Sequence, residues 1–362
     1  MTIVCSSKMS STEKRAMVLC VGGTGYIGSH TAVQLLQAGY NVAILDNCSS
    51  SSKEVIGLIE NVTQKKISFF LADLMDVIQV RAALRKTQPD VIIHFASFKS
   101  PAESLSYPLN YYRNNLVGTI NLLQVMKEEN CKRIIFSSSA AVYKLKESLI
   151  CEDDPVDPSH PYGQSKLMIE QILKDVCNSD TSWKAISLRY FNPIGAHSSG
   201  LLGDNPEYPT SLLPIIQEVA SGHRTHLNVY GNDWNTRDGT GERDYIHIED
   251  LVAGHVAAVK HICLKNTIVE ENHLIYNIGT GVGTTVLELK QAYEKACGCP
   301  IPHVFTDRRK GDLGKVMADP TKARKDLNWE ATRSIEDACV SAYNWKTSRI
   351  QKVNTTESSK KL

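Results

Sequence analysis

One stretch, VLCVGGTGYIGSHTAVQLLQAGYNVAILD from Val18 to Asp46, constrains the fold more than any other. Three evenly spaced glycines join an apolar run to a helical pattern, and a second apolar run follows. A strand that turns directly into a helix leaves unpaired N–H groups at the helix start, where the dipole favours negative charge. Gly22 would allow the tight turn, Gly25 the approach of a pyrophosphate, and Gly28 the packing of helix on strand. The stretch predicts a dinucleotide-binding unit, with a tight turn that binds no ligand as the alternative.

Asp46 ends the second predicted strand of this unit. A carboxylate there accepts hydrogen bonds from the adenosine ribose hydroxyls and repels a 2′-phosphate, so the position favours NAD over NADP. The alternative is that Asp46 only opens the polar turn that follows it.

The organisation of the rest of the chain predicts an α/β fold. Short β-branched runs alternate with helix-length segments up to residue 190, which favours a doubly wound parallel sheet of Rossmann type. Loops rich in Gly, Pro, Asn and Asp begin at Phe191 and indicate a second, smaller α/β domain. We expect an NAD-binding domain at 16–190 with a returning segment near 243–262, an interleaved substrate domain at 191–349, and flexible tails at 1–15 and 350–362.

Composition narrows the classes of partner. A formal net charge of +1 gives no overall basic excess of the kind typical of nucleic-acid-binding proteins. The ten cysteines are scattered, and the close pair Cys297 and Cys299 lacks the second half of a zinc motif, so we expect reduced thiols and no metal. No stretch is long and apolar enough to cross a bilayer. We expect a cytoplasmic protein that binds a small molecule and neither nucleic acid nor membrane.

A second pattern, IIFSSSAAVY followed by HPYGQSKLMIEQIL, carries candidate chemistry. Tyr162 and Lys166 are four residues apart in a helical segment, so both side chains emerge on one face. An ammonium beside the phenol should lower a pKa that starts near ~10 and make Tyr162 a proton acceptor. One hydroxyl of Ser137 to Ser139 is placed to bond the reacting oxygen at the end of a strand. A Tyr–Lys pair on a solvated helix is the alternative.

These motifs resemble the extended short-chain dehydrogenase/reductase family. From about Met17 to Trp345 the chain further resembles the UDP-glucose 4-epimerases, through HFASFKSPAES, YYRNN, RYFNPIGAHSSG, DGTGERDYIHIEDL, YNIGTG and RRKGDLGKVMADPTKARKDLNW. The resemblance implies reversible inversion at the sugar C4 of UDP-glucose and UDP-galactose, through a 4-keto sugar and tightly bound NAD. Tyr162, Lys166 and Ser139 would be catalytic. A homodimer is also implied, paired through the helices over 110–127 and 161–176.

The resemblance assigns two sets of binding residues. The cofactor set is Gly22, Gly25, Tyr26, Ile27, Gly28, Asp46, Asn47, Cys48, Ser49, Ser50, Ser51, Asp73, Leu74, Phe95, Ala96, Ser97, Phe98, Lys99, Asn114, Ser139, Tyr162, Lys166 and Phe191. The set around the UDP-sugar is Lys99, Ser139, Tyr162, Asn192, Ser211, Leu212, Asn228, Tyr230, Arg243, Arg309, Asp312 and Val316.

Some positions depart from the family pattern. Ser211 replaces Asn and Glu242 replaces Val beside the UDP site, which bears on nucleotide affinity. Val316 stands where some members have a tyrosine near the hexose C2 substituent. Because valine lacks the ring, the pocket should admit an acetamido group, and UDP-N-acetylglucosamine and UDP-N-acetylgalactosamine become further substrates. Lys315 reaching into that space is the opposing consideration.

Two other functions stay open on the sequence. A nucleotide-sugar 4,6-dehydratase begins with the same oxidation, but enzymes of that type place Asp-Glu after the catalytic serine or threonine, where this chain has Ala140 and Ala141. A non-catalytic NAD-binding module is compatible with the glycine turn alone.

Overall fold

A computed structural model describes residues 15–359 apart from 145, 207, 265–270 and 310–311. Its larger lobe is built on a seven-stranded sheet in the order β10-β6-β5-β4-β1-β2-β3, in which all neighbours run parallel. The strands are β1 (Met17–Val21), β2 (Asn41–Asp46), β3 (Ser68–Leu71), β4 (Val91–His94), β5 (Arg133–Ser139), β6 (Lys184–Tyr190) and β10 (His273–Ile278). The predicted doubly wound parallel sheet is confirmed.

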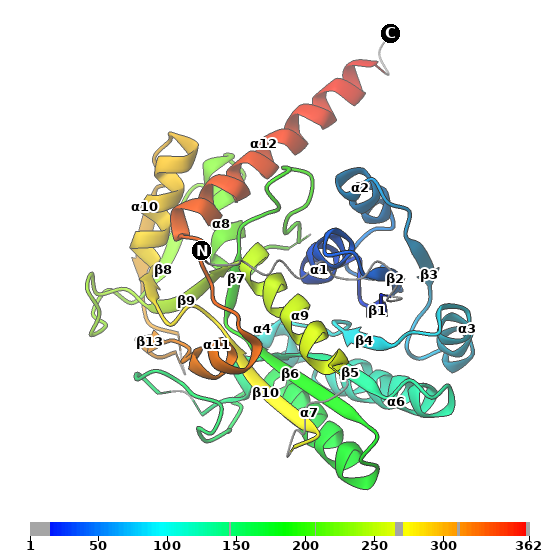
Figure 1. The fold of residues 1–362 in the computed structure, drawn as a ribbon. Coiled ribbons are helices and arrows are strands. Elements are labelled where there is room, and N and C mark those ends of the chain that lie inside the picture. Colours follow the sequence, from blue (N-terminus) through cyan, green and yellow to red (C-terminus); the bar gives the residue numbers. More distant parts are fainter. Residues whose placement is uncertain (1–14, 145, 207, 265–270, 310–311, 360–362) are drawn as a thin grey trace, which may run out of the picture.

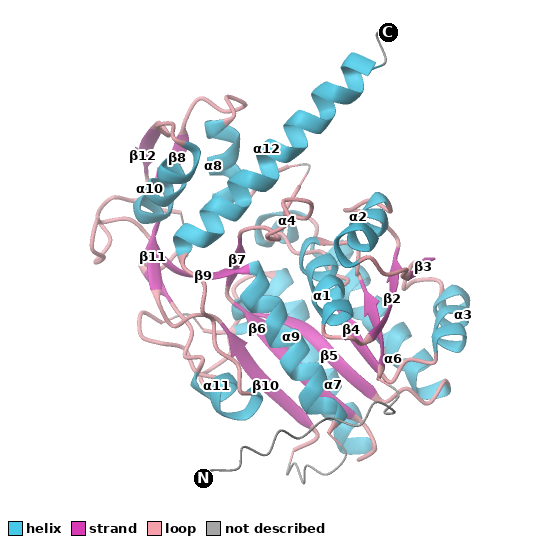
Figure 2. Ribbon diagram, turned by 45° about the horizontal axis from the view of Figure 1, so that its top comes forward, coloured by secondary structure: helices cyan, strands magenta, loops and turns pink. Residues whose placement is uncertain are grey.

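Helices cover both faces of this sheet (Figure 2). One face packs against α1 (Tyr26–Gln37), α2 (Glu54–Thr63), α9 (Ile248–Cys263) and α11 (Thr321–Leu327), and the other against α3 (Val77–Thr87), α6 (Gly118–Glu128) and α7 (Pro161–Ser179). Strand β1 shows the cause, since Val18 and Cys20 enter one apolar cluster while Leu19 and Val21 enter the other. Continuous apolar strands are what a sheet buried on both faces requires.

The smaller lobe holds two short sheets. In the first, β9 (Glu242–His247) pairs with β11 (Gly283–Thr285), β13 (Lys315–Val316) and β7 (Asn192–Ile194); in the second, β8 (Leu227–Tyr230) pairs with β12 (His303–Thr306). The helices α8 (Leu212–Ala220), α10 (Val286–Cys297) and α12 (Ile335–Ser359) pack around a separate apolar cluster.

The chain crosses between the lobes more than once. Within the predicted returning segment, β9 belongs to the smaller lobe while α9 packs on the sheet of the larger lobe. Strand β10, which the sequence analysis did not predict, then joins the large sheet beside β6. The pattern was missed because HLIYNI is short and stands alone, with no glycine turn or helix pattern to mark it.

Helix α12 continues to Ser359, into the range 350–362 where the sequence analysis expects a flexible tail. Its first half is anchored by the buried Ala338, Ala342 and Trp345. Once such a half is formed, adding further helical residues needs no new nucleation. Figure 1 shows the second half running away from the body of the molecule. Of the N-terminal tail, residues 1–14 lie outside the described residues.

Candidate active site

The glycine turn links β1 to α1, and the space around its glycines differs from one to the next. Gly22 has φ +82°, and a Cβ there would lie 2.5 Å from the backbone N of Ala96. At Gly28 a Cβ would lie 2.4 Å from the carbonyl oxygen of Gly22. The protein's own packing therefore explains these two positions, because neither has room for a side chain.

Gly25 is different, because the nearest atom to an added Cβ is 3.5 Å away, an ordinary contact. It is the N-cap of α1, carries no side-chain cap hydrogen bond, and no acidic residue stands in the first turn. The helix start is thus a shaped site without a resident negative charge. These residues fit the pyrophosphate of a dinucleotide.

Tyr26 and Ile27 form the first turn of α1. The Tyr26 hydroxyl donates a 2.8 Å hydrogen bond to the carbonyl oxygen of Gly195, which lies just beyond β7. The start of α1 is therefore hydrogen-bonded to the smaller lobe and lies where the two lobes meet.

Asp46 is buried at the end of β2, and its carboxylate accepts hydrogen bonds from Thr24 N at 2.9 Å and Cys48 N at 2.8 Å. Asp46 therefore opens the polar turn through Cys48, which was the alternative to a binding role, and it also stabilises the glycine turn through Thr24. Beside it, Asn47 Nδ2 donates to Asp73 Oδ2 at 2.7 Å. The other residues predicted to lie beside the adenosine are placed as follows. The Ser51 and Thr24 hydroxyls are hydrogen-bonded to each other, and the Ser49 N–H donates to the Asn47 side chain. Leu74 is buried against Gly118, and Ser50 is exposed.

The three serines that end β5 separate into three environments. The Ser137 carbonyl oxygen accepts a 2.7 Å hydrogen bond from Lys166 Nζ. The Ser138 hydroxyl donates to Glu170 Oε1 at 2.6 Å. The Ser139 hydroxyl caps the following turn η2 (Ala140–Val142) by accepting from Ala141 N at 3.1 Å, and its hydrogen bonding acts to lower the pKa of Tyr162. The structure therefore selects Ser139 as the serine that faces Tyr162.

Tyr162 and Lys166 lie on the predicted helix, α7, with Lys166 Nζ 5.8 Å from the centre of the Tyr162 ring. Burial raises the pKa of Tyr162, and the Ser139 hydroxyl acts against that rise. The expected lowering is therefore wrong for the protein alone. Burial also lowers the pKa of Lys166 to about 7, partly opposed by Glu170, so the lysine offers the phenol less positive charge than a solvated ammonium.

The start of α7 is fixed by contacts that the sequence analysis did not single out. His160 caps the helix by accepting from Gly163 N at 3.0 Å, and its ring stacks on that of Tyr162 at 5.9 Å between centroids. A Cβ on Gly163 would lie 2.4 Å from the Ala141 carbonyl oxygen, so glycine lets the helix approach the turn after Ser139. The sequence indicates this helix start through the run Pro161-Tyr162-Gly163, of which the sequence analysis used only Tyr162.

A buried ion pair stands one helical turn beyond Lys166. Glu170 binds Arg189 through two hydrogen bonds of 3.0 and 2.6 Å, and the two side chains are only 5% and 4% exposed. Ser138 and Arg189 are register partners on β5 and β6, so both side chains face α7. Together with the Lys166–Ser137 bond, this pair clamps the catalytic helix to two successive residues of β5.

The loop after β4 carries the predicted nicotinamide-side residues, and Asn115 organises it. Asn115 is buried in the π-helical turn Arg113–Val117, accepts from Phe98 N and Asn114 Nδ2, and donates to Ser165 Oγ on α7 at 3.0 Å. Such turns often occur at functional sites. The other residues predicted beside the nicotinamide make short-range contacts. The N–H groups of Phe95 and Ala96 donate to the Val21 carbonyl oxygen, and the Ser97 hydroxyl donates to the Phe98 carbonyl oxygen. Lys99 is exposed, with its amine 4.0 Å from the Asp204 carboxylate, and Phe191 is buried.

On the substrate side, Asp312 lies between two arginines. Its carboxylate accepts from Arg309 Nε at 2.9 Å and stands 4.0 Å from Arg243 Nη2. The Arg309 guanidinium lies 4.7 Å from the centre of the Tyr230 ring. Four predicted residues from three segments of the chain thus meet in one place. A guanidinium presents a planar fork of donors that matches phosphate oxygens.

The other predicted substrate residues lie on neighbouring elements. Asn192 donates to the Asp244 carbonyl oxygen at 2.9 Å, beside Arg243 on β9. Asn228 is exposed on β8 two residues before Tyr230. Ser211 is the N-cap of α8, without a side-chain cap hydrogen bond, and Leu212 is its first residue.

Val316 is buried in an apolar cluster with Phe191, Val142 and Tyr143, next to the turn that follows Ser139. It is the register partner of Arg243, whereas Lys315 opposes Glu242. Adjacent residues on a strand point to opposite faces, and Lys315 Nζ lies 3.8 Å from Glu242 Oε2. Lys315 is therefore turned toward Glu242 and away from the space beside Val316.

Known proteins match this chain over almost its whole length. A family model described as GDP-mannose 4,6 dehydratase matches residues 19–341. UDP-glucose 4-epimerase of Bacillus subtilis (strain 168) is 45% identical over 342 residues, which are 94% of this chain and 99% of that protein. UDP-glucose 4-epimerase of Drosophila melanogaster is 45% identical over 338 residues, 91% and 96% of the two chains.

The chain belongs to the UDP-glucose 4-epimerase family. Solved structures of epimerases agree with this assignment. The Bifidobacterium longum UDP-glucose 4-epimerase in complex with NAD⁺ and UDP has a TM-score of 0.86 at 46% identity, covering 92% of this chain and 98% of that one. The Stenotrophomonas maltophila epimerase with NAD and formylated UDP-arabinopyranose has a TM-score of 0.89 at 36% identity, covering 93% and 99%.

Within the described ranges, no helix combines the length and apolar character needed to span a membrane. The same part of the chain brings no three His, Cys, Asp or Glu side chains into a group able to hold a metal ion.

Proposed function

We propose that this chain is an NAD-dependent UDP-glucose 4-epimerase that interconverts UDP-galactose and UDP-glucose without net oxidation. The observation that carries the proposal is the arrangement of Ser139, Tyr162 and Lys166 at the carboxyl end of β5, in a member of the epimerase family. NAD, when bound, supplies the acceptor for the C4 hydride and the source of its return.

Each catalytic side chain has a role that its contacts support. Tyr162 takes the proton of the sugar 4-hydroxyl and later returns it. Lys166, held by the Ser137 carbonyl, favours the phenolate when its amine is protonated. Ser139 hydrogen-bonds the reacting oxygen at the position where β5 ends.

Arg243 and Arg309 are the proposed clamps on the diphosphate, with Asp312 orienting both guanidinium groups. Tyr230 lies beside them, where it can contact the uridine. Holding the substrate by its UDP end leaves the 4-keto sugar free to turn and present its opposite face, while proximity is kept.

The experiment that tests the epimerase is direct. The purified protein is incubated with UDP-galactose, with and without added NAD⁺, and the nucleotide sugars are separated by chromatography. Formation of UDP-glucose until both sugars are present at equilibrium supports the proposal. Release of a 4-keto-6-deoxy sugar would instead indicate a 4,6-dehydratase, for which Ala140 and Ala141 supply no acid.

We further propose that the enzyme accepts the N-acetylated pair of UDP-hexoses. Val316 is small, and Lys315 is turned toward Glu242. The test compares turnover of UDP-N-acetylglucosamine by the wild type and by Val316→Tyr, with UDP-galactose as the control substrate. Wild-type turnover that the tyrosine abolishes supports the proposal, and a wild type active only on UDP-galactose contradicts it.

A homodimer in the cytoplasm is the proposed state. The helices predicted to pair, over 110–127 and 161–176, carry the exposed apolar side chains Val117, Ile120 and Met168. Helices α4 (Pro101–Ser106) and α5 (Pro108–Tyr112) pack beside α7 and add the exposed Leu105 and Leu109. A second copy would cover them. The described cysteines are free thiols, as a reducing compartment favours. Light scattering at micromolar concentration tests the dimer, with Leu109→Glu expected to dissociate it.

A further inference from the structure

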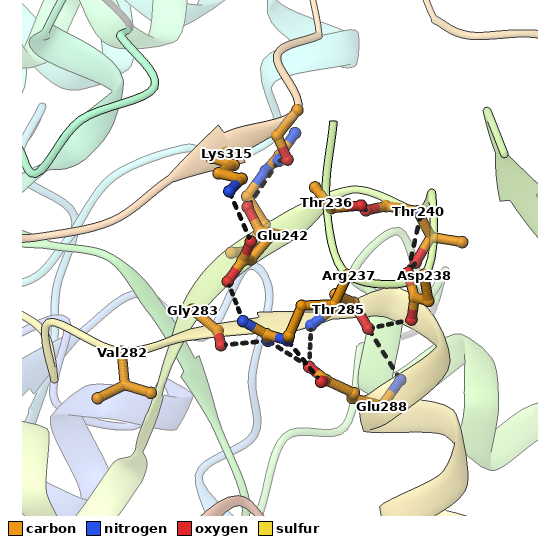
Figure 3. A network of polar contacts seen from close by, with 12 residues as sticks. Thr236, Arg237, Asp238, Thr240, Glu242, Val282, Gly283, Thr285, Glu288 and Lys315 are labelled. Carbon is orange, nitrogen blue, oxygen red and sulfur yellow. Dashed lines mark hydrogen bonds and ion pairs between the residues drawn. The ribbon is translucent and has the colours of Figure 1, made fainter. Parts of the chain in front are cut away.

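Glu242 is a buried carboxylate at the edge of the substrate site. Its side chain is 4% exposed and lies on β9 directly before Arg243. Figure 3 shows Arg237 and Lys315 meeting this carboxylate from two sides, at 2.7 Å and 3.8 Å. A buried charge is tolerated only where partners of opposite sign compensate it. Arg237 and Lys315 are the partners that compensate the buried charge of Glu242.

Arg237 is the stronger of the two partners, and it is itself anchored. It donates to the Gly283 carbonyl oxygen at 2.9 Å and forms two hydrogen bonds with Glu288, at 2.8 and 2.6 Å. Glu288 in turn forms the capping box of α10 with Thr285. These contacts hold Arg237 between β11 and α10, although its own side chain is 54% exposed (Figure 3).

The backbone of Glu242 connects this network to the diphosphate clamp. Its N–H donates to the Gly314 carbonyl oxygen at 2.7 Å, and its own carbonyl oxygen accepts from Arg243 Nη1 at 2.9 Å. Arg243 Nη1 also lies 3.0 Å from the carbonyl oxygen of Leu313. The strand that carries Glu242 thus sets where the Arg243 guanidinium stands.

Loss of the Arg237 charge would leave Glu242 with only the more distant Lys315. Glu242 and Arg243 are consecutive on β9, so their side chains face opposite sides of the sheet, and the uncompensated carboxylate would act on Arg243 through the strand and its backbone contacts. It would also draw Lys315 and the β13 strand toward itself, and β13 carries Val316 opposite Arg243.

We infer that Arg237 is a positioning residue for the nucleotide sugar: it neutralises Glu242 and holds Arg243 ready for the diphosphate without touching the ligand. This inference rests on the proposed function, because it takes Arg243 as a diphosphate clamp. It predicts an effect on binding of UDP and its sugars, while the chemistry at Ser139, Tyr162 and Lys166 is left alone.

The test measures steady-state kinetics and UDP binding on the NAD-saturated full chain. Arg237→Met should raise KM for UDP-galactose about 5–20-fold and change kcat less than about twofold, since binding is weakened equally in the ground state and in the transition state. Calorimetry should show UDP weakened by the same factor. Arg324→Met removes an exposed ion pair with Glu330 on another face and serves as the matched control, with KM expected at the wild-type value.

A double variant separates charge from structure. Arg237→Met with Glu242→Val removes the buried charge together with its partner, and should bring KM back to within about threefold of wild type. If the double variant binds UDP as poorly as Arg237→Met, only the contacts to Gly283 and Glu288 matter and the inference is overturned. Unchanged KM in Arg237→Met overturns it as well. A wild type that does not bind UDP would refute the proposed function itself, which the same titration reveals.

Discussion

Each lobe of the molecule contains a buried glutamate held by an arginine, and the two pairs differ in how they meet solvent. In the larger lobe, Glu170 and Arg189 are both almost completely buried behind the catalytic helix. In the smaller lobe, Glu242 is buried to the same degree, but Arg237 is 54% exposed and also binds Glu288.

The two pairs therefore differ in what happens when one partner is removed. A fully buried pair cannot lose one member without leaving the other charged and desolvated, so it holds its surroundings in one arrangement. When the arginine of a pair is exposed, replacing the glutamate leaves the guanidinium hydrogen-bonded to water, so no charge is stranded without a partner. The larger lobe thus keeps Tyr162 and Lys166 in one arrangement, whereas the smaller lobe can tolerate a change of charge at Glu242.

The largest expected effect tests the catalytic lobe directly. Tyr162→Phe should fold and bind NAD while epimerase activity falls about 10²–10⁴-fold, the usual contribution of a positioned acid or base. Activity is measured with UDP-galactose, and bound NAD is measured by release on denaturation. Near-normal turnover would show that another group moves the proton.

Glu170→Gln sharpens the comparison through stability. Arg189 would remain buried without a negative partner, so we expect the free energy of unfolding to fall by about 3–5 kcal/mol. Urea unfolding measures it. Ser138→Ala, which removes one hydrogen bond to Glu170, should cost only about 1 kcal/mol and is the control. A change under about 1 kcal/mol in Glu170→Gln would break the comparison.

Asp46→Ala probes the cofactor half of the larger lobe. Loss of a charge-assisted contact with the adenosine ribose should weaken NAD by about 1.5–3 kcal/mol, or roughly 10–100-fold, and leave UDP binding unchanged. Calorimetry with each ligand separates the two. Equal weakening of both would mean that Asp46 serves only the turn, through Thr24 and Cys48.

The smallest expected effect belongs to the smaller lobe. In Glu242→Val, Arg237 keeps Glu288 and solvent, so no buried charge is stranded. The free energy of unfolding should therefore change by less than about 1 kcal/mol. The same urea titration applies, and a loss comparable to that of Glu170→Gln would show that the two pairs are equivalent after all.

The sequence alone determined the features that rest on local order along the chain. The glycine spacing, the alternation of strands and helices, and the four-residue interval between Tyr162 and Lys166 each follow from the period of one element or one turn. For that reason the doubly wound parallel sheet could be predicted, except for its strand β10, and Gly25 could be singled out before its contacts were known.

Only the tertiary structure decided which distant residues meet. Nothing in the run of three serines indicates that Ser138 bonds Glu170 while Ser139 faces Tyr162, because that depends on which face α7 covers. The raised pKa of Tyr162 depends on burial in the same way. Arg237 and Glu242 are five residues apart, yet their pairing follows from how the loop and β11 return to β9. Burial and long-range pairing are properties of the packed chain, since they are set by segments far apart in sequence.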